Sequence, residues 1–95
     1  MNFDSNNPIE IPINGELDLH TFQPREIKNL VVDYLNECLK KEIYQIRIIH
    51  GKGIGNLRRT VHSLLTKIDF VESFNLAPEN AGSWGATIVK LRKKN

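Results

Sequence analysis

The chain has 95 residues, of which 40% are hydrophobic and 25% are charged, with one cysteine and a formal net charge of +2 at pH 7. This composition predicts one globular domain and excludes an internal disulfide bridge. No apolar run approaches the roughly 20 residues of a membrane-spanning helix, and the polar start MNFDSNNP does not resemble a secretory signal peptide. We therefore expect a cytoplasmic protein.

The charge is unevenly distributed along the chain. Residues 1–40 contain three Lys and Arg against seven Asp and Glu, whereas residues 41–95 contain ten against four. A separate basic half favours a polyanionic partner, although a solvated surface with a basic tail would give the same pattern.

The predicted elements follow one another in the order β-α-β-α-β-β. Residues 1–15, with two prolines and several asparagines, are expected to form a flexible N-terminal arm ahead of a domain over residues 16–95. Apolar patterning predicts strands over residues 16–20, 44–50, 70–77 and 86–92. Helical spacing of apolar residues predicts helices over residues 23–41 and about 56–67, and Pro24 and Glu26 suit the first turn of the first helix.

This order predicts an α/β two-layer sandwich. Two right-handed βαβ units make the first three strands parallel, and the short last connection makes the fourth antiparallel to the third. Both helices then cover one face of a four-stranded mixed sheet. Cys38 lies on the buried stripe of the first helix and is expected to be a core residue, whereas His62 falls on the polar side of the second and is expected to be solvated.

Unusual residues gather where the predicted strands end. His20 ends the first strand, and His50 ends the second, directly before the glycine-rich loop at residues 51–55. The carboxyl ends of parallel strands share one edge, where open α/β sheets bind ligands. If these strands are neighbours, about 5 Å apart, both histidines lie within reach of one site.

The glycine-rich loop, with Gly51, Gly53 and Gly55, predicts a phosphate site. Backbone N–H groups ahead of a helix can line an anion, and Lys52, Arg58 and Arg59 add positive charge there. The spacing matches neither G-x-x-x-x-G-K-[ST] nor G-x-G-x-x-G, so a mononucleotide site is disfavoured. The alternative is that the glycines serve only a tight turn.

Two further features of the sequence each allow more than one interpretation. Trp84, between Gly82 and Gly85, could stack on an unpaired base or fold back over the core. Asp18 and His20 are two residues apart in one strand, so their side chains face the same way. They could transfer a proton or share a metal ion, or they could be two solvated polar residues.

Three motifs resemble those of the Smr (small MutS-related) domain in order and spacing: LDLH at Leu17–His20, IIHGKGIGNLR at Ile48–Arg58 and GSWGATIVKL at Gly82–Leu91. The resemblance covers residues 16–92. It implies a stand-alone Smr protein with a βαβαββ fold, nucleic-acid binding, and endonuclease activity on DNA or RNA. The site residues that it implies are Asp18, His20, His50, Gly51, Lys52, Gly53, Gly82 and Gly85. Thr21 departs from the family, which often has glycine there.

The substrate decides the chemistry. RNA carries its own nucleophile, the 2′-hydroxyl, so His20 and His50 as acid and base, with Lys52 stabilising charge, could suffice without a cofactor. DNA requires an activated water, ordinarily with Mg²⁺ or Mn²⁺ on carboxylates such as Asp18 and Glu79. The residues favour RNA slightly. The alternatives are a non-catalytic nucleic-acid-binding module and a protein-interaction domain. In each case a protein partner could supply specificity.

Overall fold

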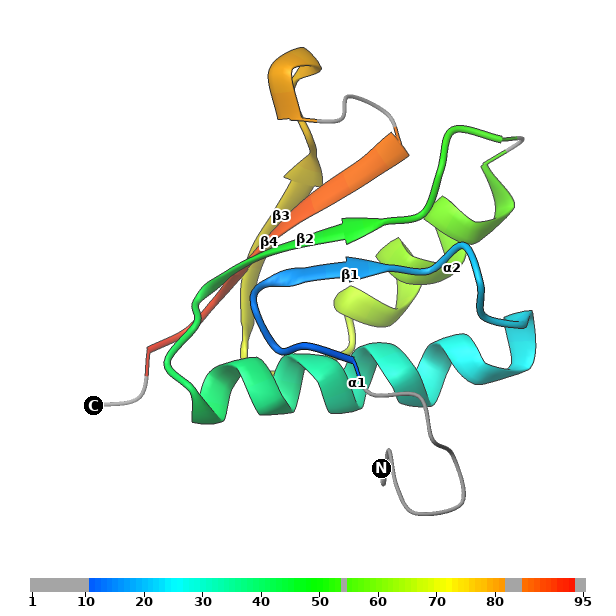
Figure 1. Ribbon diagram of the computed structural model, residues 1–95. Coiled ribbons are helices and arrows are strands. Elements are labelled where there is room, and N and C mark those ends of the chain that lie inside the picture. The colour runs from blue at the N-terminus through cyan, green and yellow to red at the C-terminus, as the bar shows by residue number, and fades with distance from the viewer. Residues whose placement is uncertain (1–10, 54, 82–84, 94–95) are drawn as a thin grey trace.

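The computed structural model describes residues 11–53, 55–81 and 85–93 (Figure 1). Its elements are β1 (Glu16–Asp18), α1 (Pro24–Lys40), β2 (Gln45–Ile49), α2 (Asn56–Leu65), β3 (Val71–Leu76), the 3-10 turn η1 (Glu79–Ala81) and β4 (Ala86–Leu91). The predicted order of strands and helices is confirmed, with each strand ending earlier than the patterning indicates. Within the described ranges, no helix is both long enough and apolar enough to cross a membrane.

The four strands form one open mixed sheet in the order β1-β2-β4-β3. β1 pairs with β2 in parallel, and β4 is antiparallel to both of its neighbours, β2 and β3. The first three strands therefore point the same way, as predicted. The prediction from the sequence did not include the position of β4 between β2 and β3.

The core lies between the sheet and the two helices, which cover the same face (Figure 1). Alternation along the strands turns apolar side chains toward the helices, and helical spacing on α1 and α2 turns theirs toward the sheet. The buried residues include Leu17, Leu19, Ile46, Ile48 and Val89 of the sheet side, and Ile27, Leu30, Val31, Tyr34, Leu35, Cys38, Val61 and Leu65 of the helices. The prediction that Cys38 is a core residue is confirmed.

The start of α1 fixes the short connection that follows β1. Glu26 accepts a hydrogen bond from the backbone N–H of Gln23 at 2.8 Å, and Pro24 occupies the first turn, where its missing N–H costs nothing. The helix therefore begins at Pro24, one residue inside the predicted range, and five residues separate it from the end of β1.

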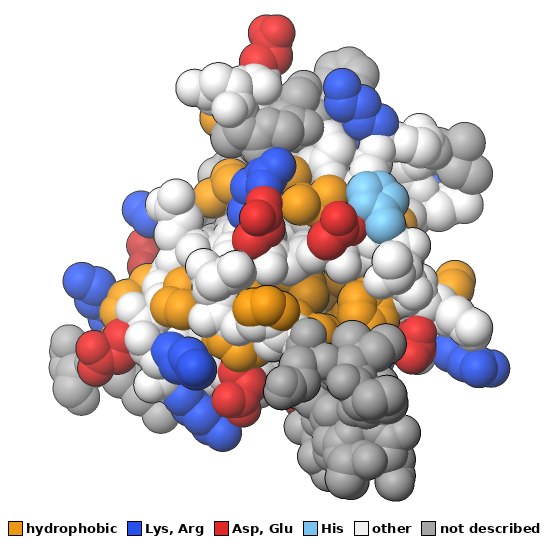
Figure 2. Space-filling model, in the orientation of Figure 1, with side chains coloured by type: hydrophobic (Ala, Val, Ile, Leu, Met, Phe, Trp, Pro, Cys, Tyr) orange, Lys and Arg blue, Asp and Glu red, His pale blue; other side chains and the backbone are white. Residues whose placement is uncertain are grey.

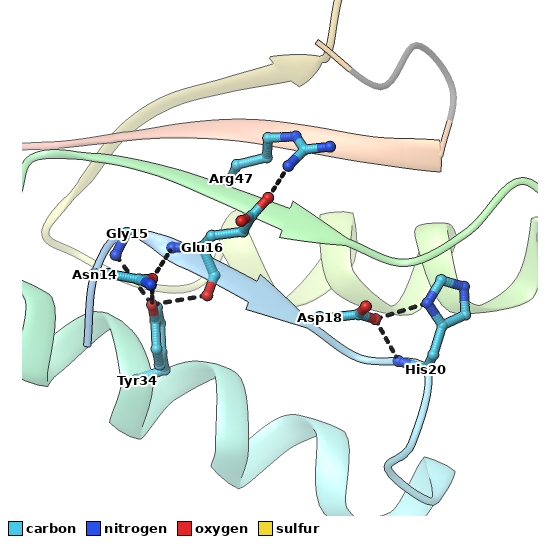
Figure 3. Close-up of polar contacts among 7 residues, drawn as sticks. All are labelled: Asn14, Gly15, Glu16, Asp18, His20, Tyr34 and Arg47. Carbon is cyan, nitrogen blue, oxygen red and sulfur yellow. Dashed lines mark hydrogen bonds and ion pairs between the residues drawn. The ribbon is translucent and has the colours of Figure 1, made fainter. Parts of the chain in front are cut away.

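Tyr34 on α1 hydrogen-bonds the chain at the start of β1. Its hydroxyl donates to the carbonyl of Glu16 at 3.0 Å and accepts from the N–H of Gly15 at 3.1 Å (Figure 3). The described part of the expected N-terminal arm also packs on the core, through Ile11 and Ile13. These contacts hold β1, and with it the residues at its end, against α1.

The face of the sheet that is not covered by the helices is polar over β1 and β2. Glu16 and Arg47 form an ion pair across these strands, and Asp18 lies on the same face. Figure 2 shows charged side chains of both signs and a histidine on this exposed surface. A ligand can therefore approach the strand ends from this face.

Candidate functional site

Asp18 and His20 form a hydrogen-bonded pair at the carboxyl end of β1. Oδ1 of Asp18 lies 2.6 Å from Nδ1 of the His20 ring and accepts from the His20 backbone N–H at 2.9 Å (Figure 3). A carboxylate only accepts, so it holds the proton on Nδ1, and Nε2 of the neutral ring keeps a lone pair. The His20 side chain is 58% exposed. The arrangement is that of an imidazole oriented to take a proton from a ligand.

Gly51 provides the surface against which the His20 ring rests. Its φ is +83°, and a β-carbon here would stand 3.0 Å from Nε2 of His20. The N–H groups of Gly51 and His50 both donate to the carbonyl of Gly85, at 2.9 and 3.0 Å. Glycine suits this position for two reasons: the backbone is left-handed, and the His20 side chain comes too close to leave room for a β-carbon. Because its N–H is already bonded, Gly51 does not offer that group to an anion.

The two histidines of the predicted site lie on opposite faces of the sheet. The parallel register of β1 and β2 places His50 on the helix-covered side with Leu19, and His20 on the exposed side with Gly51. His50 is only 5% exposed. The strand ends are neighbours, as expected, but the two rings do not face a common site.

Thr87 on β4 connects His50 to His62 on α2. Its Oγ1 lies 2.8 Å from Nε2 of each ring, and Nδ1 of His50 lies 3.0 Å from the carbonyl oxygen of Gly51. A carbonyl only accepts, so Nδ1 of His50 carries the proton and its Nε2 accepts the Thr87 hydroxyl proton. That hydroxyl has no second proton, so Nε2–H of His62 must donate to it.

The resulting chain of donors runs from His62 through Thr87 and His50 to the carbonyl of Gly51. Burial lowers the pKa of His50; the hydrogen bond to Gly51 opposes this change, and the charge of Arg58 adds to it. Burial also lowers the pKa of His62, with His50 and Arg58 acting in the same direction. Both rings are therefore neutral near pH 7, which fits the assigned protons.

The expectation of a solvated His62 is wrong. The ring is half-buried and packs edge-on against Phe74, with 4.9 Å between the ring centroids. Sequence patterning also misses Thr87. The signal in the sequence was its position: Thr87 shares the inward-facing positions of β4 with Val89 and Leu91. A polar side chain buried there needs a hydrogen-bond partner inside the protein.

Positive charge gathers at the start of α2. Gly55 caps this helix with φ +85°, and a β-carbon there would stand 2.9 Å from a terminal nitrogen of Arg58 and 3.3 Å from one of Arg59. Lys52 passes close to Gly85, with Cγ 3.6 Å from the corresponding point on that glycine. The first turn of α2 has no acidic residue. Helix dipole and cations therefore act together to favour an anion.

We call Asp18, His20, Gly51 and Lys52 the His20 rim. Beyond it in the loop, Gly53 has φ +23°, and no atom of the described residues lies within 4 Å of the point where a β-carbon would stand. Gly82 and Trp84 of the predicted site lie outside the described residues. The loop that follows the His20 rim is thus open to a ligand at Gly53.

The described residues do not form a ligand set that fits Mg²⁺ or Mn²⁺. Among them, no three His, Cys, Asp or Glu side chains gather closely enough to hold a metal ion. Asp18 is the carboxylate of the His20 rim, and its Oδ1 already accepts two hydrogen bonds from His20. Glu79 lies in η1 and does not join it in such a group.

Comparison with known proteins shows what this chain is similar to. The family model of the Smr domain matches residues 17–92. The endonuclease MutS2 of Carboxydothermus hydrogenoformans is 39% identical over 79 residues, and that of Lactococcus lactis is 35% identical over 80 residues. These alignments cover 83% and 84% of the chain, which spans only 10% of the length of each relative.

Two solved structures share the fold. The Smr domain of Thermus thermophilus MutS2 is 35% identical with a TM-score of 0.78, and the match covers 83% of this chain and 99% of that one. YdaL, a stand-alone small MutS-related protein from Escherichia coli, is 30% identical with a TM-score of 0.76, covering 83% of this chain and 65% of that one.

Proposed function

Because the chain belongs to the Smr domain family, a family of nucleic-acid-binding nucleases, we propose that it binds nucleic acid at the His20 rim and cleaves RNA there. The observation that carries the proposal is the Asp18–His20 pair. Among the described residues, none hydrogen-bonds Nε2 of this exposed imidazole. The ring lies beside a cationic loop, so it can act as a general base on a phosphodiester.

The proposed reaction uses the 2′-hydroxyl of RNA as the nucleophile. Nε2 of His20 takes the hydroxyl proton, the 2′-oxygen attacks the adjacent phosphorus, and the bond from phosphorus to the 5′-oxygen breaks. The 5′-oxygen takes a proton from the imidazolium or from water. The products are a 2′,3′-cyclic phosphate and a 5′-hydroxyl. Asp18 holds Nδ1–H and balances the charge of the ring while it is protonated.

Cations next to the base supply the second part of the proposal. Lys52 follows Gly51, on which the His20 ring rests, so its ammonium can reach the phosphate whose negative charge grows during attack. Arg58 and Arg59, at the start of α2, suit the neighbouring phosphates.

In this proposal His50 is a positioning residue. Both of its nitrogens are hydrogen-bonded, one of them to the carbonyl of Gly51, so it fixes the peptide under the His20 ring. This role replaces the acid–base partnership of His20 and His50 expected from the sequence. The contribution of Gly82 and Trp84 to binding stays a prediction.

The test is cleavage of a labelled single-stranded RNA, with EDTA and with Mg²⁺. We expect cleavage in EDTA that leaves a cyclic phosphate, and no cut where a single 2′-deoxy nucleotide replaces the cleaved position. His20→Asn keeps a donor to Asp18 but has no Nε2, and it should lower the rate by about 10²-fold or more. Lys52→Ala should weaken binding and reduce the salt slope of the affinity by about one.

Two results would count against this reaction. Nicking of supercoiled DNA that needs added Mg²⁺ or Mn²⁺, with RNA left intact, would contradict the RNA proposal. Salt-dependent binding of RNA and DNA without any cut would make the chain a non-catalytic nucleic-acid-binding module.

A further inference from the structure

An apolar pocket opens between the beginnings of the two helices. It has a volume of about 210 Å³ and is lined by Phe22, Pro24, Ile27, Asn56, Leu57 and Thr60. Phe22 and Leu57 pack on the core on one side and remain half-exposed on the other. The pocket therefore offers an aromatic ring and aliphatic walls to a ligand from solvent.

The apolar pocket adjoins the His20 rim. Phe22 follows His20 by two residues, so their Cα atoms are at most about 7.6 Å apart. The Phe22 N–H donates to the carbonyl of Leu19 at 3.1 Å, which turns the chain back on itself. On the other wall, Asn56 and Leu57 directly follow Gly55, the cap of α2. The two segments that carry the proposed site thus also build this pocket.

A cationic groove continues from the apolar pocket between α1 and α2. Its volume is about 430 Å³, and it is lined by Lys28, Arg59, Thr60, Ser63, Leu64 and Lys67. Thr60 lines both hollows, so they lie on either side of this residue or meet at it. Three positive charges and two hydroxyl groups face the groove, and the lining given by the described residues includes no acidic side chain. Such a surface attracts a chain of phosphates.

We propose that the apolar pocket receives one unpaired base of a nucleic-acid strand, whose phosphates lie on the cationic groove on one side and at the His20 rim on the other. This inference rests on the proposed function and deepens it, because it makes the substrate a strand that is single or locally unpaired at the point of cleavage. Bases within a duplex have both faces stacked, whereas an unpaired base can stack on an aromatic ring.

The alternation of surfaces is what favours this occupant. A strand presents an apolar base face between anionic phosphates, and the protein presents an apolar pocket between two cationic surfaces. Asn56 adds a polar group at the pocket. Its Oδ1 accepts from Arg59 at 2.5 Å, which leaves its amide nitrogen to donate to a base edge.

The experiment compares two oligonucleotides of equal length, one intact and one abasic throughout, by fluorescence anisotropy. Both carry the same phosphates, so the difference in affinity isolates the bases. We expect the intact strand to bind about tenfold or more tightly. Phe22→Ala should remove most of that difference and leave the affinity for the abasic strand unchanged. Phe22→Leu, which keeps apolar packing without the ring, guards against a folding defect and should behave like Phe22→Ala.

The cationic groove is tested by charge removal. Replacing Lys28 and Lys67 by alanine should weaken binding of both strands alike and reduce the salt slope by about two. The matched control replaces Lys40 and Lys41 by alanine, at the far end of α1, which changes the net charge equally and should leave both affinities unaltered.

The outcomes separate the base pocket from the function on which it rests. Equal affinity for the intact and abasic strands, or equal affinity for a single strand and a full duplex, would overturn the base pocket. Salt-dependent binding in the same experiment would still uphold nucleic-acid binding. If the Lys28 and Lys67 variant bound like its control, the path along the groove would be wrong. Binding to no strand at all would overturn both proposals.

Discussion

Nε2 of His20 lies 3.0 Å from the point at which a β-carbon on Gly51 would stand. The first glycine of the loop is therefore part of the geometry of His20. Its N–H is bonded to Gly85 and its carbonyl to His50, so the Gly51 peptide is held from both sides. Gly51, which the sequence predicts to bind phosphate, thus also contacts the ring of the proposed base.

Gly51→Ala should therefore damage catalysis more than binding. The left-handed backbone should cost alanine about 1–2 kcal/mol of folding free energy, and the new methyl group must displace the His20 ring. Gly53→Ala is the matched control. Its φ of +23° is also strained for alanine, but no atom of the part of the chain that the structure describes lies within 4 Å of the added carbon. Urea denaturation and RNA cleavage would be measured for both. An equal loss of cleavage in the two variants would show that the contact with His20 is irrelevant.

Asp18→Asn should lower the cleavage rate while leaving the fold intact. The amide oxygen can still accept from the His20 backbone and ring, so the ring keeps its orientation, but the negative charge that balances the imidazolium is lost. We expect a rate between those of the wild type and His20→Asn, with RNA affinity unchanged or slightly improved. A wild-type rate in Asp18→Asn would remove the carboxylate from the mechanism.

Thr87→Val should destabilise the domain despite its nearly unchanged shape. The hydroxyl both donates to His50 and accepts from His62, so valine leaves two polar groups without partners. Each such group costs about 1–3 kcal/mol when it is buried. Thr87→Ser keeps the hydroxyl and should lose less. Chemical denaturation of the two variants compares them directly, and a more stable valine variant would contradict the assigned hydrogen bonds.

The stability of the domain should fall as the pH decreases below about 6.5, the ordinary pKa of histidine. The pKa values of His50 and His62 are lowered in the folded state, so the unfolded chain takes up these protons first. The stabilisation is complete above the unfolded-state pKa and is lost as the pH falls toward the folded-state values.

Urea denaturation between about pH 7.5 and about pH 5 measures this dependence. His62→Gln keeps a donor to Thr87 but does not titrate, so its stability should depend less on pH than that of the wild type. Carboxylates contribute equally to both proteins. Identical pH profiles would show that His62 is not responsible.

Cys38 should be inert in the native protein. It is fully buried, and burial raises the pKa of its thiol to about 11, so the reactive thiolate is scarce at about pH 8. A thiol reagent such as dithionitrobenzoate should label the chain only after denaturation. Rapid labelling without denaturant would reveal an opening of α1 that the packing does not suggest.

The elements of the fold were predictable because alternation and helical spacing are local signals, whereas the strand order was not. A short connection makes β4 antiparallel to β3 but does not say which neighbour lies on its other side. One signal was present in the composition of the strands. β4 carries apolar residues on both faces, including Ala86 and Ile88, while β3 exposes Glu72 and Asn75. Apolar residues on both faces are typical of a central strand.

In the candidate site, too, the local relations could be predicted from the sequence and the long-range ones could not. The Asp18–His20 pair follows from a spacing of two residues, which needs no information beyond one strand. The relation of His20 to His50 depends on the register between two strands separated by a helix, where a slip of one residue reverses every side chain. The chain from His62 to Gly51 requires three elements to be placed together, which no local pattern specifies.

The central place of β4 has a consequence for biosynthesis. β4 is translated after β1, β2 and β3, yet it lies between β2 and β3, and its Lys90 pairs with Gln45 of β2. The sheet can therefore be completed only after β4 has left the ribosome, because β2 and β3 pair with each other only through it. A chain that stopped before Ala86 would leave the edge of β2 unpaired and prone to aggregate. Such a fragment would be a substrate for chaperones and proteases, not a weaker version of the domain.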